Sequence, residues 1–266
     1  MAKDKSTFPR GTPVIALASL QGGSGKTTTA ISLAAGLARK GKKVLFVDID
    51  PLAIGSSSFL LPQSPQFRKE ESIYAALYNG KPLPIYPTGL ANLSLVPSHP
   101  GIVSDEQLTH TPDSDHPEQL LKIKSELDKI KQHYDFVFID TPSVLDWLTL
   151  NALVAADMVI VPFIPSYSAP STFTLMSEGI KTAKQINPNL AAIGYLAVTS
   201  NSSAIVQPFD QKLLPRSAGA RLLTTSIPFD DAINEANFSH KDVFKFRPNS
   251  KAARAYLGLI NELFTF

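Results

Sequence analysis

Short runs of apolar residues alternate along the chain with amphipathic segments of helical length. The apolar runs are as long as single strands and carry few charges, which is typical of strands buried on both faces of a sheet. We expect strands at 14–20, 44–48, 136–140, 158–162, 193–199 and 222–227. We expect helices at 27–40, 118–132, 172–186 and 251–264.

The first strand, a glycine-rich turn, the first helix and the second strand follow one another within residues 14–48. A helix that joins two strands in this way makes the strands parallel and the crossover right-handed. The alternation then continues to the end of the chain. The sequence therefore predicts an α/β fold with a doubly wound, mostly parallel sheet in one domain at 14–266, after a polar lead at 1–13.

Residues 60–117 interrupt this rhythm with many of the 21 prolines and only two weak elements, a helix near 72–78 and a strand at 93–96. We interpret the segment as an irregular excursion. It is either a solvated loop or a surface for a partner, and the sequence favours the loop.

Composition narrows the chemistry. The chain has 266 residues, is 44% hydrophobic and has no cysteine, which excludes disulfides, thiolate metal sites and a cysteine nucleophile. Its 25 basic and 23 acidic residues give a net charge of +2, so any nucleic-acid or membrane surface has to be a local patch. We find no apolar run long enough for a membrane span and no signal peptide, and we expect a cytoplasmic protein.

The sharpest motif is the turn between the first strand and the first helix. Glycines allow successive backbone N–H groups to surround a phosphate, a lysine reaches the β- and γ-phosphates, and a hydroxyl binds Mg²⁺. The motif comprises Gln21, Gly22, Gly23, Ser24, Gly25, Lys26, Thr27 and Thr28. It departs from the general pattern G-x-x-x-x-G-K-[ST], because Leu20 occupies the first glycine position. Its place between a buried strand and a helix nevertheless predicts a phosphate-binding loop and a fold of the P-loop NTPase type.

Three aspartates fit the same chemistry. Asp48 and Asp50 end one predicted strand, and Asp140 ends another. Ligands of open α/β sheets bind at the carboxyl ends of the strands, where such carboxylates orient Mg²⁺ or water. Each aspartate taken alone could instead cap the following turn.

These segments resemble the deviant Walker A ATPases, which include the ParA and Soj partition proteins and their relative MinD. The resemblance rests on QGGSGKTTT at 21–29, VLFVDIDP at 44–51 and YDFVFIDTPS at 134–143, and it covers nearly the whole chain. It implies an ATP- and Mg²⁺-dependent homodimer that binds nonspecific DNA, with hydrolysis stimulated by an adaptor protein such as a ParB-like partner. The implied cargo is a plasmid, a chromosome or a large assembly such as a carboxysome, and the implied location is the nucleoid.

The resemblance also assigns roles to residues. Lys26 and Thr27 bind phosphate and Mg²⁺, Asp48 and Asp140 support Mg²⁺, and Asp50 positions the water. Pro228, in the sequence SIPF, corresponds to a segment that contacts adenine.

The chain departs from the family pattern at two places. Gln21 stands where the signature lysine precedes the glycines, and a neutral amide cannot supply a cation to the transition state. Phe229 and Ala232 stand where relatives often have arginines that help to hold DNA. Other basic residues remain, either as a candidate DNA-binding set or simply as a solvated surface: Arg216, Arg221, Lys241, Lys245, Arg247, Lys251 and Arg254.

Two rival functions follow from these features. A nucleotide-gated binding module with little hydrolysis would suit the absence of the signature lysine. A MinD-like ATPase bound to a membrane would need an amphipathic C-terminal helix with a basic polar face. The C-terminal helix instead has Glu262 and few cations, so we expect Ala253, Tyr256, Leu257, Ile260 and Phe264 to pack into the core.

Overall fold

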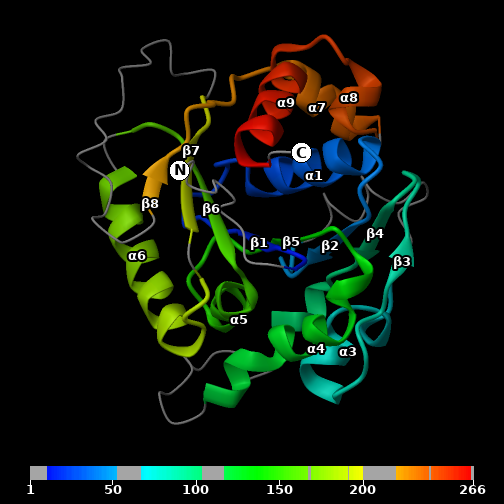
Figure 1. Ribbon diagram of the computed structural model, residues 1–266, viewed down its shortest axis with the longest axis vertical. Coiled ribbons are helices and arrows are strands. Elements are labelled where there is room, and N and C mark those ends of the chain that lie inside the picture. Colours follow the sequence, from blue (N-terminus) through cyan, green and yellow to red (C-terminus); the bar gives the residue numbers. More distant parts are fainter. Residues whose placement is uncertain are drawn as a thin grey trace, which may run out of the picture.

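The computed structural model describes residues 11–52, 67–103, 117–166, 169–190, 192–199, 220–239 and 241–264. In these residues an eight-stranded sheet forms the centre of the molecule, in the order β3-β4-β2-β5-β1-β6-β7-β8 (Figure 1). All neighbouring strands are parallel except the edge pair β3 and β4. The predicted single-domain α/β fold with a mostly parallel sheet is therefore confirmed.

The central strands lie close to the predicted positions, except that β1 ends at residue 17, where the glycine-rich turn approaches, and does not reach the predicted residue 20. In chain order, the strands are β1 (Val14–Leu17), β2 (Val44–Asp48), β3 (Tyr86–Pro87), β4 (Leu93–Val96), β5 (Phe136–Asp140), β6 (Met158–Phe163), β7 (Ala192–Ala197) and β8 (Ala220–Leu222). Every residue of β1, β2, β5 and β6 is buried. This explains why they appear in the sequence as continuous apolar runs.

Helices cover both faces of the sheet (Figure 1). On one face, α1 (Lys26–Arg39) and α9 (Lys251–Leu263) pack with Ile15 and Leu17 of β1. Val14 and Ala16 of the same strand point into the other core, which contains α5 (Trp147–Ala155) and α6 (Ala169–Ile186). The remaining α-helices are α3 (Tyr74–Asn79), α4 (Lys122–Ile130), α7 (Asp231–Phe238) and α8 (Val243–Phe246). Short 3₁₀ turns lie at Lys69–Glu71, Pro100–Val103, Pro117–Leu121 and Lys131–His133.

Within the excursion at 60–117, the two weak elements are present as α3 and β4. Strand β4 pairs with β2 along its whole length, and Leu93, Leu95 and Val96 are buried. Residues 67–103 therefore belong to the sheet and its core, whereas the rest of the segment up to 116 lies outside the described residues.

Two further predicted details are wrong. The last strand is Ala220–Leu222 and does not extend over 222–227; only Ile227 returns to the sheet, in a single bridge with Val198. Leu257 is 37% exposed, because it projects from the side of α9 that faces away from the core. The other four predicted core residues of this helical segment are buried, as expected.

Candidate phosphate and magnesium site

The predicted phosphate loop joins the end of β1 to the start of α1. Gly23 and Gly25 have positive φ angles of +72° and +84°, which side chains with a Cβ atom rarely adopt. Gly25 is the N-cap residue of α1, and no side chain in the described segments caps this end of the helix. The first N–H groups of α1 therefore remain available to an anion, and the positive end of the helix dipole favours one.

Lys26 is buried beside this loop. Its side chain is directed toward the carboxyl end of β5, where its ammonium donates a hydrogen bond to Ser143 Oγ. Burial lowers the pKa of Lys26, and the carboxylates of Asp140 and Asp50 partly offset this effect.

The three predicted aspartates come together at the same edge of the sheet. Asp48 and Asp140 are partners in the β2–β5 register, and both are fully buried. Asp48 Oδ1 accepts the N–H of Asp50 at 3.0 Å, and Asp50 Oδ1 accepts the N–H of Leu52 at 2.9 Å. Asp50 is half-buried and lies at the start of the turn that follows β2.

Burial dominates the electrostatics of the two inner carboxyl groups. It raises the pKa of Asp140 to about 7, although the Thr27 hydroxyl and the Lys26 ammonium favour the charged form. Burial and the nearby Asp140 also raise the pKa of Asp48 well above its usual range. Two buried carboxyl groups that lie side by side need a nearby cation if both are to be charged at once.

This donor set fits Mg²⁺. Asp48 Oδ2 and both carboxylate oxygens of Asp140 are buried without a hydrogen-bond partner among the described residues, and Thr27 lies beside them. Carboxylate and hydroxyl oxygens are ligands that Mg²⁺ prefers. In the part of the chain that the structure describes, no three acidic, histidine or cysteine side chains are placed so that they could hold a metal ion together. Phosphate oxygens and water would therefore have to complete the coordination, as is usual for Mg²⁺.

The Gln21 side chain is held by a contact within the chain. Its Oε1 accepts the N–H of Ile164, just beyond β6, at 2.9 Å. The Gln21 main-chain carbonyl accepts the N–H of Ser24 at 3.3 Å. The side chain thus ties the start of the phosphate loop to the neighbouring strand.

The segment that contains Pro228 lies next to the phosphate loop. A Cβ atom at Gly25 would be 3.8 Å from Val198, which bridges to Ile227. The N–H of Phe229 then donates to Thr199 Oγ1 at 2.9 Å.

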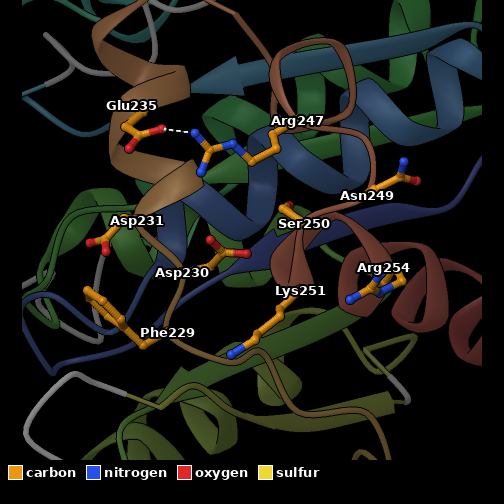
Figure 2. A pocket seen from close by; sticks show the side chains of 9 residues that line it. All are labelled: Phe229, Asp230, Asp231, Glu235, Arg247, Asn249, Ser250, Lys251 and Arg254. Atoms are coloured by element: carbon orange, nitrogen blue, oxygen red, sulfur yellow. Dashed lines mark ion pairs between the residues drawn. The ribbon is translucent and has the colours of Figure 1, made fainter.

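Beyond Pro228 the surface opens into a pocket of about 550 Å³ (Figure 2). Phe229, Lys251 and Arg254 line the pocket, and Asp230 lies between α7 and α9. Across it, Arg247 forms an ion pair with Glu235 at 2.7 Å.

The candidate DNA-binding residues do not all gather on one surface. Arg247, Lys251 and Arg254 line the pocket, and Lys241 and Lys245 are exposed near it on α8 and the turn before it. Arg221 lies in edge strand β8, close to Thr224, whose N–H binds Glu262 near the C-terminal end of α9. That end is about 16 Å along the helix from Lys251. Arg216 lies outside the described residues.

The two positions that differ from the family pattern have different surroundings. Ala232 is fully buried at the start of α7, and its N–H is bound by Asp230. Phe229 is half-buried at the pocket.

Comparison with known proteins places this architecture in a family. A family model described as an AAA domain matches residues 12–192. The chain is 31% identical over 253 residues to the chromosome partitioning protein ParA of Myxococcus xanthus, covering 94% of this chain and 87% of the relative. It is 33% identical over 251 residues to the chromosome-partitioning ATPase Soj of Thermus thermophilus, covering 94% of each chain. This chain belongs to the ParA/Soj family of P-loop ATPases.

Structural comparison agrees with this membership in the ParA/Soj family. The septum site-determining protein MinD of Pyrococcus horikoshii, in complex with Mg-ADP, superimposes with a TM-score of 0.74 at 25% identity, and 96% of each chain is covered. The fold of the P-loop NTPase type predicted from the sequence is therefore confirmed.

Three contacts at or behind the site could not be predicted from the sequence. Ser143 contacts Lys26, Ile164 holds Gln21, and Tyr256 of α9 reaches Thr29 of α1. Ser143 ends the segment 134–143 that carries the resemblance and Tyr256 was expected in the core, but their partners could not be foreseen, because each contact joins segments that are far apart along the chain.

Proposed function

We propose that this chain binds and hydrolyses Mg-ATP at the edge of the sheet formed by the phosphate loop, β2 and β5. The proposal rests above all on the buried Lys26, which faces unpartnered carboxylate oxygens beside an uncapped helix N-terminus. An anion and a cation are both needed to balance these charges, and a magnesium-bound polyphosphate supplies both.

Each residue of the site has a specific role in this proposal. The backbone of residues 21–28 and the Lys26 ammonium bind the phosphates, while Thr27, Asp48 and Asp140 hold Mg²⁺ directly or through water. When bound, Mg²⁺ neutralises charge that develops on the phosphate oxygens. The Asp50 carboxylate orients the attacking water, a role that fits its partly open position after β2.

We place the nucleoside on the other side of the phosphate loop. Pro228 contacts adenine, and the pocket that begins at Phe229 receives the base or the ribose. Support comes from the contacts that join Gly25 through Val198 to Ile227, since they keep this pocket beside the phosphates.

At the level of the cell, we propose a partitioning or positioning ATPase. The chain forms a homodimer with ATP, binds nonspecific DNA and thereby associates with the nucleoid, and turns over ATP slowly until a ParB-like adaptor on the cargo stimulates it. Family membership supports this assignment, because relatives are named as chromosome partitioning proteins. The cargo is a plasmid, a chromosome or a large assembly such as a carboxysome.

Attachment to a membrane has less support. None of the helices in the described segments could cross a bilayer. The apolar side of α9, which includes Tyr256, Ile260 and Leu263, is buried in the protein core. Binding of α9 to lipid would require this core to open.

One observation favours a nucleotide-gated module with little hydrolysis as a second candidate. Gln21 carries no charge, and its side-chain oxygen is already used within the subunit. The rate of phosphate release with and without DNA distinguishes the two: an ATPase completes many turnovers, whereas the module stays bound to its first ATP.

The test of the nucleotide site is a titration with a fluorescent ATP analogue in Mg²⁺. We expect Lys26→Ala to lose at least about 100-fold in affinity, because a charge-assisted contact to phosphate is removed from a buried site. Lys129→Ala, which removes an exposed lysine on α4, is the control and should bind as the wild type does. Equal affinity of the two variants would contradict the proposed site.

A further inference from the structure

The C-terminal helix α9 contacts the helix that carries the phosphate loop through a buried pair of hydroxyl groups. Tyr256 OH lies 3.2 Å from Thr29 Oγ1, and both residues are buried. Burial raises the pKa of Tyr256 to about 12, although hydrogen bonding with Thr29 and Ser32 partly offsets it. The hydroxyl is therefore neutral at every pH at which the protein works, and it can only donate or accept a hydrogen bond.

Thr29 is part of the first turn of α1. Its N–H donates to Gly25 O at 2.8 Å, so it lies directly behind the phosphate loop. Two further contacts hold α1 to the C-terminal helices. A Cβ atom at Gly36 would be 2.4 Å from Ile260 Cδ1, which indicates close approach of α1 and α9. Arg39 Nε donates to Asp242 Oδ1 at 3.0 Å at the far end of α1. A shift of α9 therefore moves α1 with it.

The N-terminal end of α9 is held to the segment that we propose contacts the nucleoside. Asp230 Oδ2 accepts the N–H of Ala252 in the first turn of α9 at 2.9 Å. Asp230 Oδ1 accepts the N–H of Ala232 at the start of α7 at 3.0 Å. Because Asp230 directly follows Pro228 and Phe229, α9 connects the nucleoside segment to the phosphate loop.

We propose that Tyr256 is a positioning residue that sets the separation between the phosphate loop and the nucleoside pocket, by holding α1 to α9 through Thr29. A ligand that occupies both places at once needs this separation to be correct. Without the hydroxyl pair, the ligand has to restore the correct separation when it binds, and this lowers the net free energy of binding. A ligand that occupies only the phosphate loop has no such requirement. This inference rests on the proposed function, since it assumes that nucleotide spans the two places.

The chain offers a matched control. Tyr195 in β7 is also a fully buried tyrosine, but its hydroxyl has no hydrogen-bond partner in the described segments. Tyr256→Phe and Tyr195→Phe therefore delete the same atom from the core. They differ in whether that atom joins α9 to α1.

The experiment compares the affinities of Mg-ATP and Mg-tripolyphosphate for the wild type and both variants by calorimetry. We expect Tyr256→Phe to weaken Mg-ATP binding by roughly twofold to tenfold, the range expected for one buried hydrogen bond, and to leave tripolyphosphate binding unchanged. Tyr195→Phe should change neither. Thr29→Val removes the hydrogen bond from the other side. It should cause a selective loss of the same kind, and the double variant should lose no more than Tyr256→Phe alone.

Three results have distinct meanings. Equal losses for both ligands in Tyr256→Phe, or an ATP affinity equal to that of Tyr195→Phe, would overturn the positioning role and leave the proposed function intact. Failure of the wild type to bind Mg-ATP would overturn the proposed function and this inference with it. If Tyr256→Phe does not fold, Thr29→Val provides the same comparison between the two ligands.

Discussion

The proposed nucleotide site consists of a few charged side chains that are buried where the strands end. Lys26, Asp48 and Asp140 are each at most 5% exposed, and burial works against the charged form of all three. Such an arrangement is costly for folding and is typical of functional sites. Asp50 differs, because it is only half-buried and its carboxylate accepts a hydrogen bond from the turn that follows it.

This difference separates the role of Asp50 from that of its neighbours. We expect Asp50→Ala and Asp50→Asn both to bind ATP within about threefold of the wild type and to lose at least about 100-fold in kcat, because only the orientation of the water is removed. Asparagine keeps an oxygen that can accept the N–H of Leu52, so it preserves the turn. Phosphate release is the measurement. Normal turnover by Asp50→Asn would assign Asp50 to the turn alone.

A second prediction concerns Gln21, where the resemblance to the family implies a lysine. Both Gln21→Lys and Gln21→Ala remove the oxygen that accepts the N–H of Ile164. Only Gln21→Lys also places a cation at the exposed edge of the sheet. If this position faces the ATP of a partner subunit, the two variants should differ in kcat, because only the lysine can stabilise the developing phosphate charge. Identical rates and identical dimerisation for the two variants would show that position 21 acts only within its own subunit.

At the scale of elements, Asp230 joins two helices at their N-termini. One carboxylate oxygen binds an N–H of α7 and the other binds an N–H of α9. Although burial raises the pKa of Asp230, the hydrogen bonds from Ala252 and Ala232 outweigh it, and the pKa of the carboxyl group is lower than usual. Folding therefore favours the charged form.

We expect Asp230→Ala to lower the free energy of unfolding by about 1–3 kcal/mol, because the N-cap of α7 and a charged hydrogen bond to the first turn of α9 are lost. Asp231→Ala removes the neighbouring exposed carboxylate and is the control. The pKa of Asp230 is lower in the folded state than in the unfolded chain, where it is about 4. Asp230 therefore contributes its full share to the free energy of unfolding at pH values above the unfolded pKa. This contribution is lost as the pH falls through the lower folded value. Denaturation by urea at pH 7 and at pH 3 tests this. A difference between wild type and Asp230→Ala that does not shrink at pH 3 would contradict it.

The elements also show what the sequence could predict. Strands β2 and β5 lie at the predicted residues, because a short, continuous apolar run between polar residues is typical of a buried strand. Helix α5 was missed because all of its residues are buried, so it has no polar face to mark a period of 3.6 residues. Helix α8 has only four residues and carries little pattern of its own.

The candidate site was predictable to a similar extent. The phosphate loop and the three aspartates are local motifs at strand ends, and the fold brings them together. The contacts of Gln21 with Ile164 and of Thr29 with Tyr256 join residues that are 143 and 227 positions apart. No local pattern could have indicated which pairs would meet.

At the scale of the whole molecule, the exposed Lys241 and Lys245 lie near the pocket but do not line it, and we propose that they contact DNA. We expect nonspecific DNA binding in ATP with a slope of log affinity against log salt of about −3 to −4 per dimer. Lys241→Ala with Lys245→Ala should weaken binding to all sequences alike and leave ATP affinity unchanged. Lys124→Ala with Lys129→Ala on α4, which lies on the opposite face of the sheet, is the charge-matched control (Figure 1). Mobility shifts at two salt concentrations test this. An equal loss of DNA affinity in the two double variants would contradict a local DNA surface.

We propose above all that ATP acts through an assembly of two chains, and light scattering of Asp50→Ala measures this most directly. This variant should retain bound ATP, so the assembly can be observed without turnover. We expect a dimer in Mg-ATP and a monomer in Mg-ADP or without nucleotide. A monomer in Mg-ATP, or the same mass under all three conditions, would contradict the proposal.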